Sequence, residues 1–139
     1  MRCIGFACRM TLVSLAALFV CSCAGMGTTG SKYMDQKIFP VPQAMTLEEA
    51  TIRGAQAVRD TGGLVIKQTD SAGFISAKIT KGWWINKLSY FLEVHLSMPE
   101  KGRLKAHASS VAGPEVAYTD ELDSIVNDFY KAFEKALAR

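Results

Sequence analysis

The chain has 139 residues, of which 49% are hydrophobic and 21% charged, and its formal net charge is +3. This length suits one domain with an adequate apolar core, and the charge is too small for a dedicated nucleic-acid-binding protein. All four cysteines lie within the first 23 positions, which excludes a disulfide scaffold, a cysteine-ligated zinc site and a thiol nucleophile in the rest of the chain.

The first 22 residues have the plan of a signal peptide. Residues 1–10 contain two arginines and no acidic residue, and residues 11–20 form an apolar run. A charged start followed by a short apolar run is typical of secretion signals, whereas a membrane-spanning helix needs about 20 apolar residues. We therefore expect residues 1–22 to direct export and to be removed, which leaves a net charge of +1. One alternative is that this segment stays in the protein as a membrane-spanning helix. The other is that the protein is an ordinary secreted protein cut near Ala24.

The segment that follows the apolar run, Val20-Cys21-Ser22-Cys23, resembles the lipobox of bacterial lipoproteins. In that motif an aliphatic residue and two small residues precede the cysteine that receives the lipid, although Cys21 departs from the commonest pattern. The resemblance implies a diacylglycerol on Cys23, cleavage before it and acylation of the new N-terminus. Two or three acyl chains anchor a protein stably. Ala24, by analogy with lipoprotein sorting in Gram-negative bacteria, implies the outer membrane, with the domain facing the periplasm.

Residues 23–43 are expected to be the lipidated cysteine and a flexible tether. Three glycines in residues 25–30 match G-x-G-x-x-G, but a dinucleotide site needs a strand before the motif and a helix after it. The order Ser31-Lys32 is also the reverse of that in a phosphate-binding loop. We therefore expect no nucleotide and no other cofactor. The prolines within residues 39–42 favour extended backbone.

The folded domain is expected over residues 44–139 and to begin with a helix over residues 46–61. Thr46 and Glu49 have the spacing of a capping box, and Gly62-Gly63 is a stop signal. The expected buried stripe of this helix has mostly small side chains, which suit close packing on a sheet: Leu47, Ala50, Gly54, Ala57 and Val58.

Four strands are then predicted, over residues 64–69, 74–80, 86–98 and 103–112. The third is the clearest, because its apolar and polar residues alternate with period two, which indicates one buried face and one open face.

A last helix is predicted over residues 120–138, with Thr119 as a candidate N-cap. Its apolar residues repeat at intervals of three and four: Leu122, Ile125, Val126, Phe129, Phe133, Ala136 and Leu137.

This order of elements predicts an α+β fold, with a four-stranded antiparallel meander and both helices packed on one face (α-β-β-β-β-α). The pattern is similar to small α+β domains of envelope lipoproteins, including the helix-grip domains of BamC from the outer-membrane assembly machinery. That resemblance implies a scaffold or binding role.

Two histidines are expected to meet on the polar face of the sheet. The strand register that places Met98 opposite Leu104 also places His95 opposite His107, about 5 Å apart at their Cβ atoms, with Glu93 diagonal to the pair. Zinc sites take three or four protein ligands, so we expect two solvated histidines and no physiological metal.

Aromatic residues mark the candidate binding surface. Phe74 and Phe91 are expected on the polar sheet face among several lysines, and Trp83 and Trp84 in the loop over residues 81–85. The charges alone fit a solvated sheet face without a specific site, which is the alternative, but exposed aromatic side chains indicate contact with a partner. We expect one of the two tryptophans to be buried and the other at least partly exposed.

No motif for catalysis is present, since no G-x-S-x-G elbow occurs and the acidic residues near the start of the last helix complement its dipole. The sequence therefore predicts a lipid-anchored cell-envelope protein, not an enzyme, whose domain binds or scaffolds another envelope component. The alternative is a carrier or sensor of a small apolar ligand, held between the sheet and the last helix beside Phe129, Tyr130 and Phe133.

Overall fold

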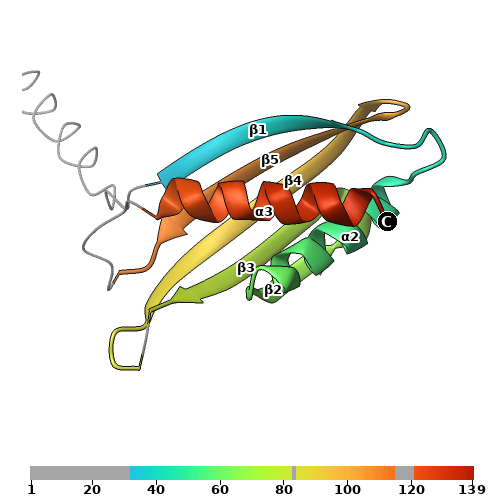
Figure 1. Cartoon of the computed structure of the whole chain (residues 1–139). Helices are drawn as coiled ribbons and strands as arrows, with labels where there is room; N and C mark the ends of the chain where they lie inside the picture. Colours follow the sequence, from blue (N-terminus) through green and yellow to red (C-terminus); the bar gives the residue numbers. More distant parts are fainter. Residues whose placement is uncertain (1–31, 83, 115–120) are drawn as a thin grey trace, which may run out of the picture.

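The structure is a computed structural model that describes residues 32–82, 84–114 and 121–139. In chain order the elements are β1 (Lys32–Pro40), α2 (Leu47–Asp60), β2 (Leu64–Thr69), the 3-10 turn η1 (Asp70–Ala72), β3 (Phe74–Lys81), β4 (Leu88–Glu100), β5 (Arg103–Ala112) and α3 (Leu122–Leu137). The strands form one antiparallel sheet in the order β1-β5-β4-β3-β2. Both helices lie on the same face of this sheet (Figure 1), so the α+β class and the one-sided packing of the helices are confirmed.

The alternation predicted for the third meander strand is present in β4. Leu92, Val94 and Leu96 are buried against the helices, and the residues between them are exposed. On α3, the buried residues of the predicted stripe cover this face, and among them Phe129 and Phe133 are fully buried. The core therefore lies in a single layer between the sheet and the two helices.

At the start of α2, one of the two hydrogen bonds of the predicted capping box is present. The Oγ1 atom of Thr46 accepts a hydrogen bond from the Glu49 amide at 3.1 Å. The Glu49 carboxylate accepts instead from the guanidinium of Arg53 at 2.7 Å, and the same guanidinium donates to the Ala136 carbonyl at 2.9 Å. Arg53 thereby fastens α2 to the last turn of α3, where unpaired carbonyls need donors.

Gly54 lets α2 approach the core closely. A Cβ atom at this position would lie 2.8 Å from the Cδ1 atom of Ile75 and 3.5 Å from the ring of Phe133. A glycine in a helix interior costs about 1 kcal/mol relative to alanine. The close packing expected from the sequence explains why that cost is tolerated here.

The sheet has five strands and not the four predicted, because residues 32–40 form β1 and are not part of a tether. β1 pairs antiparallel with β5 at the sheet edge, and Phe39, opposite Leu104, is buried. The Tyr130 hydroxyl on α3 donates to the Asp35 carbonyl of β1 at 2.8 Å. The described sheet therefore includes residues 32–40, which were expected in the tether, and residues 1–31, with the lipobox and the glycine motif, lie outside the described residues.

The turn between β4 and β5 also differs from the prediction. Leu96 lies opposite Ala106 as expected, but the register shifts between Ser97 and Glu100, so Met98 and Leu104 do not pair in the ladder. An extra residue accommodated in this way is a β-bulge, which increases the local twist of the strands. Thr119, the candidate N-cap of the last helix, lies outside the described residues. Neither α2 nor α3 has the combination of length and apolarity needed to cross a membrane.

Replacing Gly54 by leucine tests the close contact between α2 and the core. The added side chain has to displace Ile75 and Phe133, and we expect a loss of about 1–3 kcal/mol in the free energy of unfolding, as is typical of overpacked cores. Urea denaturation of Gly54→Leu measures the effect, and Gln56→Leu, at an exposed position of the same helix, is the matched control. Equal midpoints for the two variants would contradict the close packing.

The hydroxyl of Tyr130 gives a second test, through the pH dependence of stability. Burial raises the pKa of Tyr130 to about 12, whereas an unfolded tyrosine titrates near pH 10. The contribution of protonated Tyr130 to the free energy of unfolding is therefore complete below pH 10 and is lost as the pH rises through 12. We expect Tyr130→Phe to lose about 1 kcal/mol at neutral pH, since the single hydroxyl proton shared between the Asp35 and Ala106 carbonyls is removed.

Between about pH 9 and pH 11 the free energy of unfolding of Tyr130→Phe should fall less than that of the wild type. The phenylalanine has no hydroxyl group to titrate, so this pH-dependent loss is absent from the variant. Urea unfolding at the two pH values gives the comparison. An identical loss in both proteins would show that Tyr130 does not control the alkaline limb.

Candidate functional site

The face of the sheet opposite the helices, called the open face below, carries rows of side chains that cross all five strands. Their partners follow from the strand register. The first row is Lys32, Val111, Phe91, Lys78 and Leu64; the second is Met34, Ser109, Glu93, Ser76 and Lys67; the third is Gln36, His107, His95, Phe74 and Thr69.

The two histidines lie directly opposite one another on β4 and β5, so their predicted pairing is confirmed. The ring of Phe74 lies 4.9 Å from the ring of His95 on the other side. Glu93 is in the next row, diagonal to the pair. Within the described residues no group of three or more histidine, cysteine, aspartate or glutamate side chains is placed to hold a metal ion.

The open face combines exposed apolar side chains with positive charge. Phe91 in its centre is 37% exposed, and Met34 and Leu64 towards the two edges are 55% and 68% exposed. Phe74 is partly covered, because the Nζ atom of Lys67 lies 5.8 Å from its ring centre. Four lysines belong to the paired positions of this face, with Glu93 as the acidic residue among them: Lys32, Lys67, Lys78 and Lys105.

The connection between β3 and β4 presents the most exposed aromatic side chain of the described residues. Trp84 is 82% exposed and its neighbour Ile85 is 95% exposed. This agrees with the expectation that one tryptophan of the pair would be at least partly exposed. Trp83 lies outside the described residues, so the expected burial of the other tryptophan stays a prediction.

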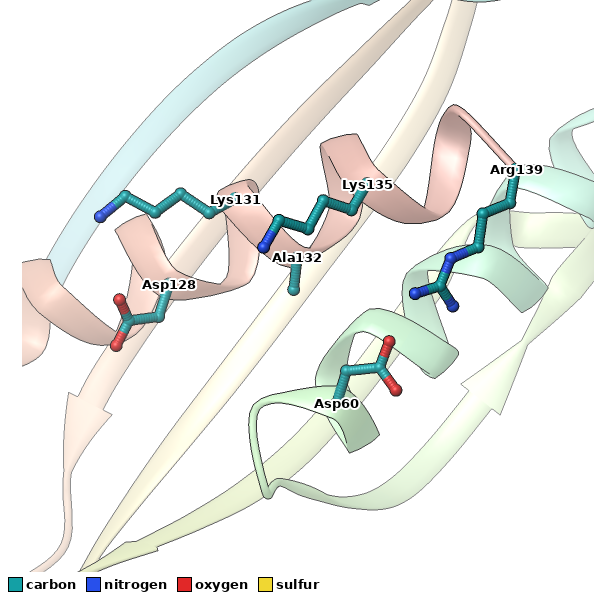
Figure 2. A pocket seen from close by; sticks show the side chains of 6 residues that line it. All are labelled: Asp60, Asp128, Lys131, Ala132, Lys135 and Arg139. Atoms are coloured by element: carbon teal, nitrogen blue, oxygen red, sulfur yellow. The ribbon is translucent and has the colours of Figure 1, made fainter.

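A pocket that the sequence did not reveal lies on the helical side of the molecule, between the end of α2 and α3. Its volume is about 450 Å³, and it is shallow and open. Figure 2 shows the side chains of Lys135 and Arg139 extending from the end of α3 on the side that faces Asp60 of α2. Asp128, Lys131 and Ala132 complete the lining. Lysines and an arginine four residues apart share one helix face, but only the packing of α2 against α3 converts that face into a pocket.

The space between the sheet and α3, where the ligand-carrier alternative needs a cavity, is filled by side chains. Phe129 and Phe133 are 0% exposed, and Tyr130 is 3% exposed. Side chains that line a cavity large enough for water would expose surface to it. The ring of Phe133 packs instead against Phe39 of β1 at 5.3 Å and against Phe129 at 5.4 Å. No room for a ligand is present beside these three residues in this conformation.

No model of a protein family matches this sequence, and no curated protein is detectably similar to it. Among solved structures, the chain is similar to Ara h 8.0201, with a TM-score of 0.50 and 14% identity over 78% of this chain and 99% of that one. It is also similar to an uncharacterized protein from Bacillus thuringiensis, with a TM-score of 0.44 and 13% identity over 78% and 100% of the two chains. TTHA0849 from Thermus thermophilus gives a TM-score of 0.44 and 9% identity over 78% and 97%. At this identity the similarity to Ara h 8.0201 shows a shared fold and nothing about function.

Proposed function

We propose that this protein is a lipid-anchored component of the cell envelope, most consistent with the outer membrane, whose domain binds an acidic surface of another envelope protein through the open face and does not catalyse a reaction. The observation that carries the proposal is the open face, on which none of the described elements packs and Phe91 is exposed beside Lys78, while both helices lie on the opposite side.

The chemistry of the open face supports a protein partner. Large exposed apolar side chains on a sheet are costly in water and mark interaction surfaces. Phe91 supplies an aromatic anchor of the kind that dominates interface energies. The neighbouring Lys78 lies in the same row as Phe91, and Lys67 in the next. Their charge favours an acidic partner and raises the rate of encounter with it.

The shape of the molecule supports binding without catalysis. Enzyme sites are concave and combine a nucleophile or acid–base pair with groups that stabilise charge. The pocket between α2 and α3 is lined by two aspartates, two lysines, an arginine and an alanine, with no serine, cysteine or histidine. The histidines and Phe91 lie on an uncovered sheet face, outside that pocket.

The proposed anchor at Cys23 lies nine residues before the start of β1. A chain of that length reaches at most about 30 Å when it is fully extended. The domain would then stay close to the lipid surface and would meet partners that lie in or on the same membrane.

Photo-crosslinking tests the open face as a partner-binding surface. A photo-reactive phenylalanine derivative replaces Phe91 in one variant and Asn127, which is exposed on α3, in a matched control. We expect irradiation of intact cells to yield a crosslinked species at position 91 in at least tenfold excess over position 127, because only the open face would be covered. Free monomer alone at position 91 would overturn the proposal for this face.

Mass spectrometry of the protein from membranes tests the anchor. We expect a loss of residues 1–22 and an added acyl mass on Cys23. Cys23→Ala should abolish both changes, because the alanine has no thiol to receive a lipid, while Cys21→Ala should leave them intact. A Cys23→Ala chain that is still cut before residue 23 and still fractionates with membranes would contradict the assignment.

A further inference from the structure

The β3–β4 connection, residues 82–87, presents two adjacent apolar side chains to solvent at one end of the sheet. Trp84 is 82% exposed and Ile85 is 95% exposed, which is more than any other large apolar side chain of the described residues. Lys87 beside them is also exposed. Neither apolar side chain contributes to the core, so the packing of the domain does not explain them.

Two residues of this connection have backbone angles in the left-handed region. Gly82 has a φ of 110°, and a side chain there would collide with the Asn86 carbonyl. Trp84 has a φ of 50°, in the left-handed region that bulky residues rarely adopt. The Nζ atom of Lys81, at the base of the connection, lies 3.4 Å from Glu121 and donates to Ser124 of α3 at 3.3 Å. Trp84 is therefore exposed in a backbone conformation that costs free energy, and strain of this kind is characteristic of functional positions.

The connection and the start of β1 lie at the same end of the sheet (Figure 1). Lys32 belongs to the same row as Phe91, two strands away, which corresponds to about 10 Å across the sheet. β4 begins at Leu88, three residues before Phe91, so the connection extends about 10 Å further along the strands. The nine residues from Cys23 to Lys32 reach at most about 30 Å. Cys23 and Trp84 are therefore able to reach one flat surface together.

We propose that Trp84 and Ile85 insert into the interfacial layer of the membrane that carries the Cys23 lipid, with Lys87 against anionic headgroups. Tryptophan favours this layer, because its ring is apolar and its N–H group stays near water, and a lysine beside it is attracted by anionic lipid. The inference rests on the proposed anchor. With the lipid in place the contact is intramolecular, so a small apolar tip is sufficient to keep it formed.

Such a second contact fixes the orientation of the domain. A lipid on a short tether limits the distance to the membrane but leaves the domain free to rotate. With the β3–β4 connection in the interface, the strands run away from the bilayer and the open face is presented sideways, toward neighbours in the same membrane.

Tryptophan fluorescence in vesicles tests the insertion. The chain, purified from host membranes, is reconstituted into phosphatidylcholine–phosphatidylglycerol vesicles whose acyl chains carry bromine near the headgroup. Trp83→Phe leaves Trp84 as the only tryptophan. We expect brominated lipid to quench its emission at least twofold and aqueous iodide to lose access to it. A matched control, Trp83→Phe with Trp84→Phe and Phe91→Trp, places the reporter on the open face, where we expect iodide access and no quenching by lipid.

The charge of Lys87 gives a second readout. We expect Lys87→Glu to reduce the quenching of Trp84 by brominated lipid in vesicles that contain phosphatidylglycerol, and to leave it unchanged in pure phosphatidylcholine. Equal quenching of the variant and its parent in both lipids would overturn the role of Lys87.

Flotation of the same samples separates the inference from the proposed anchor. If the chain floats with the vesicles while Trp84 stays accessible to iodide, the insertion is overturned and the anchor stands. A crosslink from a photo-probe at position 84 to another protein would also overturn the insertion, and would show that Trp84 contacts a protein partner. A Cys23→Ala chain that the cell still cuts before residue 23, that still floats with the vesicles and whose Trp84 is quenched would instead overturn the anchor and support the insertion. A chain that neither floats nor shows quenching would overturn both.

Discussion

The aromatic stripe of α3 packed against one face of the sheet is the contact on which the rest of the molecule depends. Phe129 and Phe133 are fully buried between helix and strands, and the ring of Phe39 from β1 packs against Phe133 at 5.3 Å. A sheet of this kind is stable only when its apolar face is covered. α3 covers the side of that face formed by β1 and β5, and α2 lies beside it over β2 and β3, with Gly54 packed against Ile75 and Phe133.

The consequence of placing both helices on one side is a bare second face. On it the strand register alone brings together residues that are distant in sequence, such as Phe74, His95 and His107 in one row. This row places a partly covered phenylalanine beside two histidines, with the Nζ atom of Lys67 5.8 Å from the ring centre of Phe74. The β3–β4 connection adds a separate apolar point at the sheet end, with Trp84 held by a strained backbone. The two surfaces differ in place, since one lies along the strands and the other beyond their ends.

A structural feature could be predicted from the sequence where it depends on residues that are close together in the chain. The bond from the Glu49 amide to Thr46 and the alternation of β4 were predicted, since both are local patterns. The opposition of His95 and His107 was predicted too, because matching the apolar residues of two adjacent strands leaves one register. β1 was not predicted. Its inner side carries Asp35 and Lys37, so period two is absent from its sequence.

The sequence by itself therefore determined the α+β class, most element boundaries and the residues that β3, β4 and β5 contribute to the open face, because periodicity and turn residues act over a few positions. Only the tertiary structure decided the fifth strand, the burial of Tyr130 and the pocket between the helices. Distant elements hold β1 instead: the Tyr130 hydroxyl donates to the backbone carbonyl of Asp35 at 2.8 Å, and the side chain of Lys37 lies 3.8 Å from that of Glu134. Such contacts join residues about a hundred positions apart, and no local pattern records them.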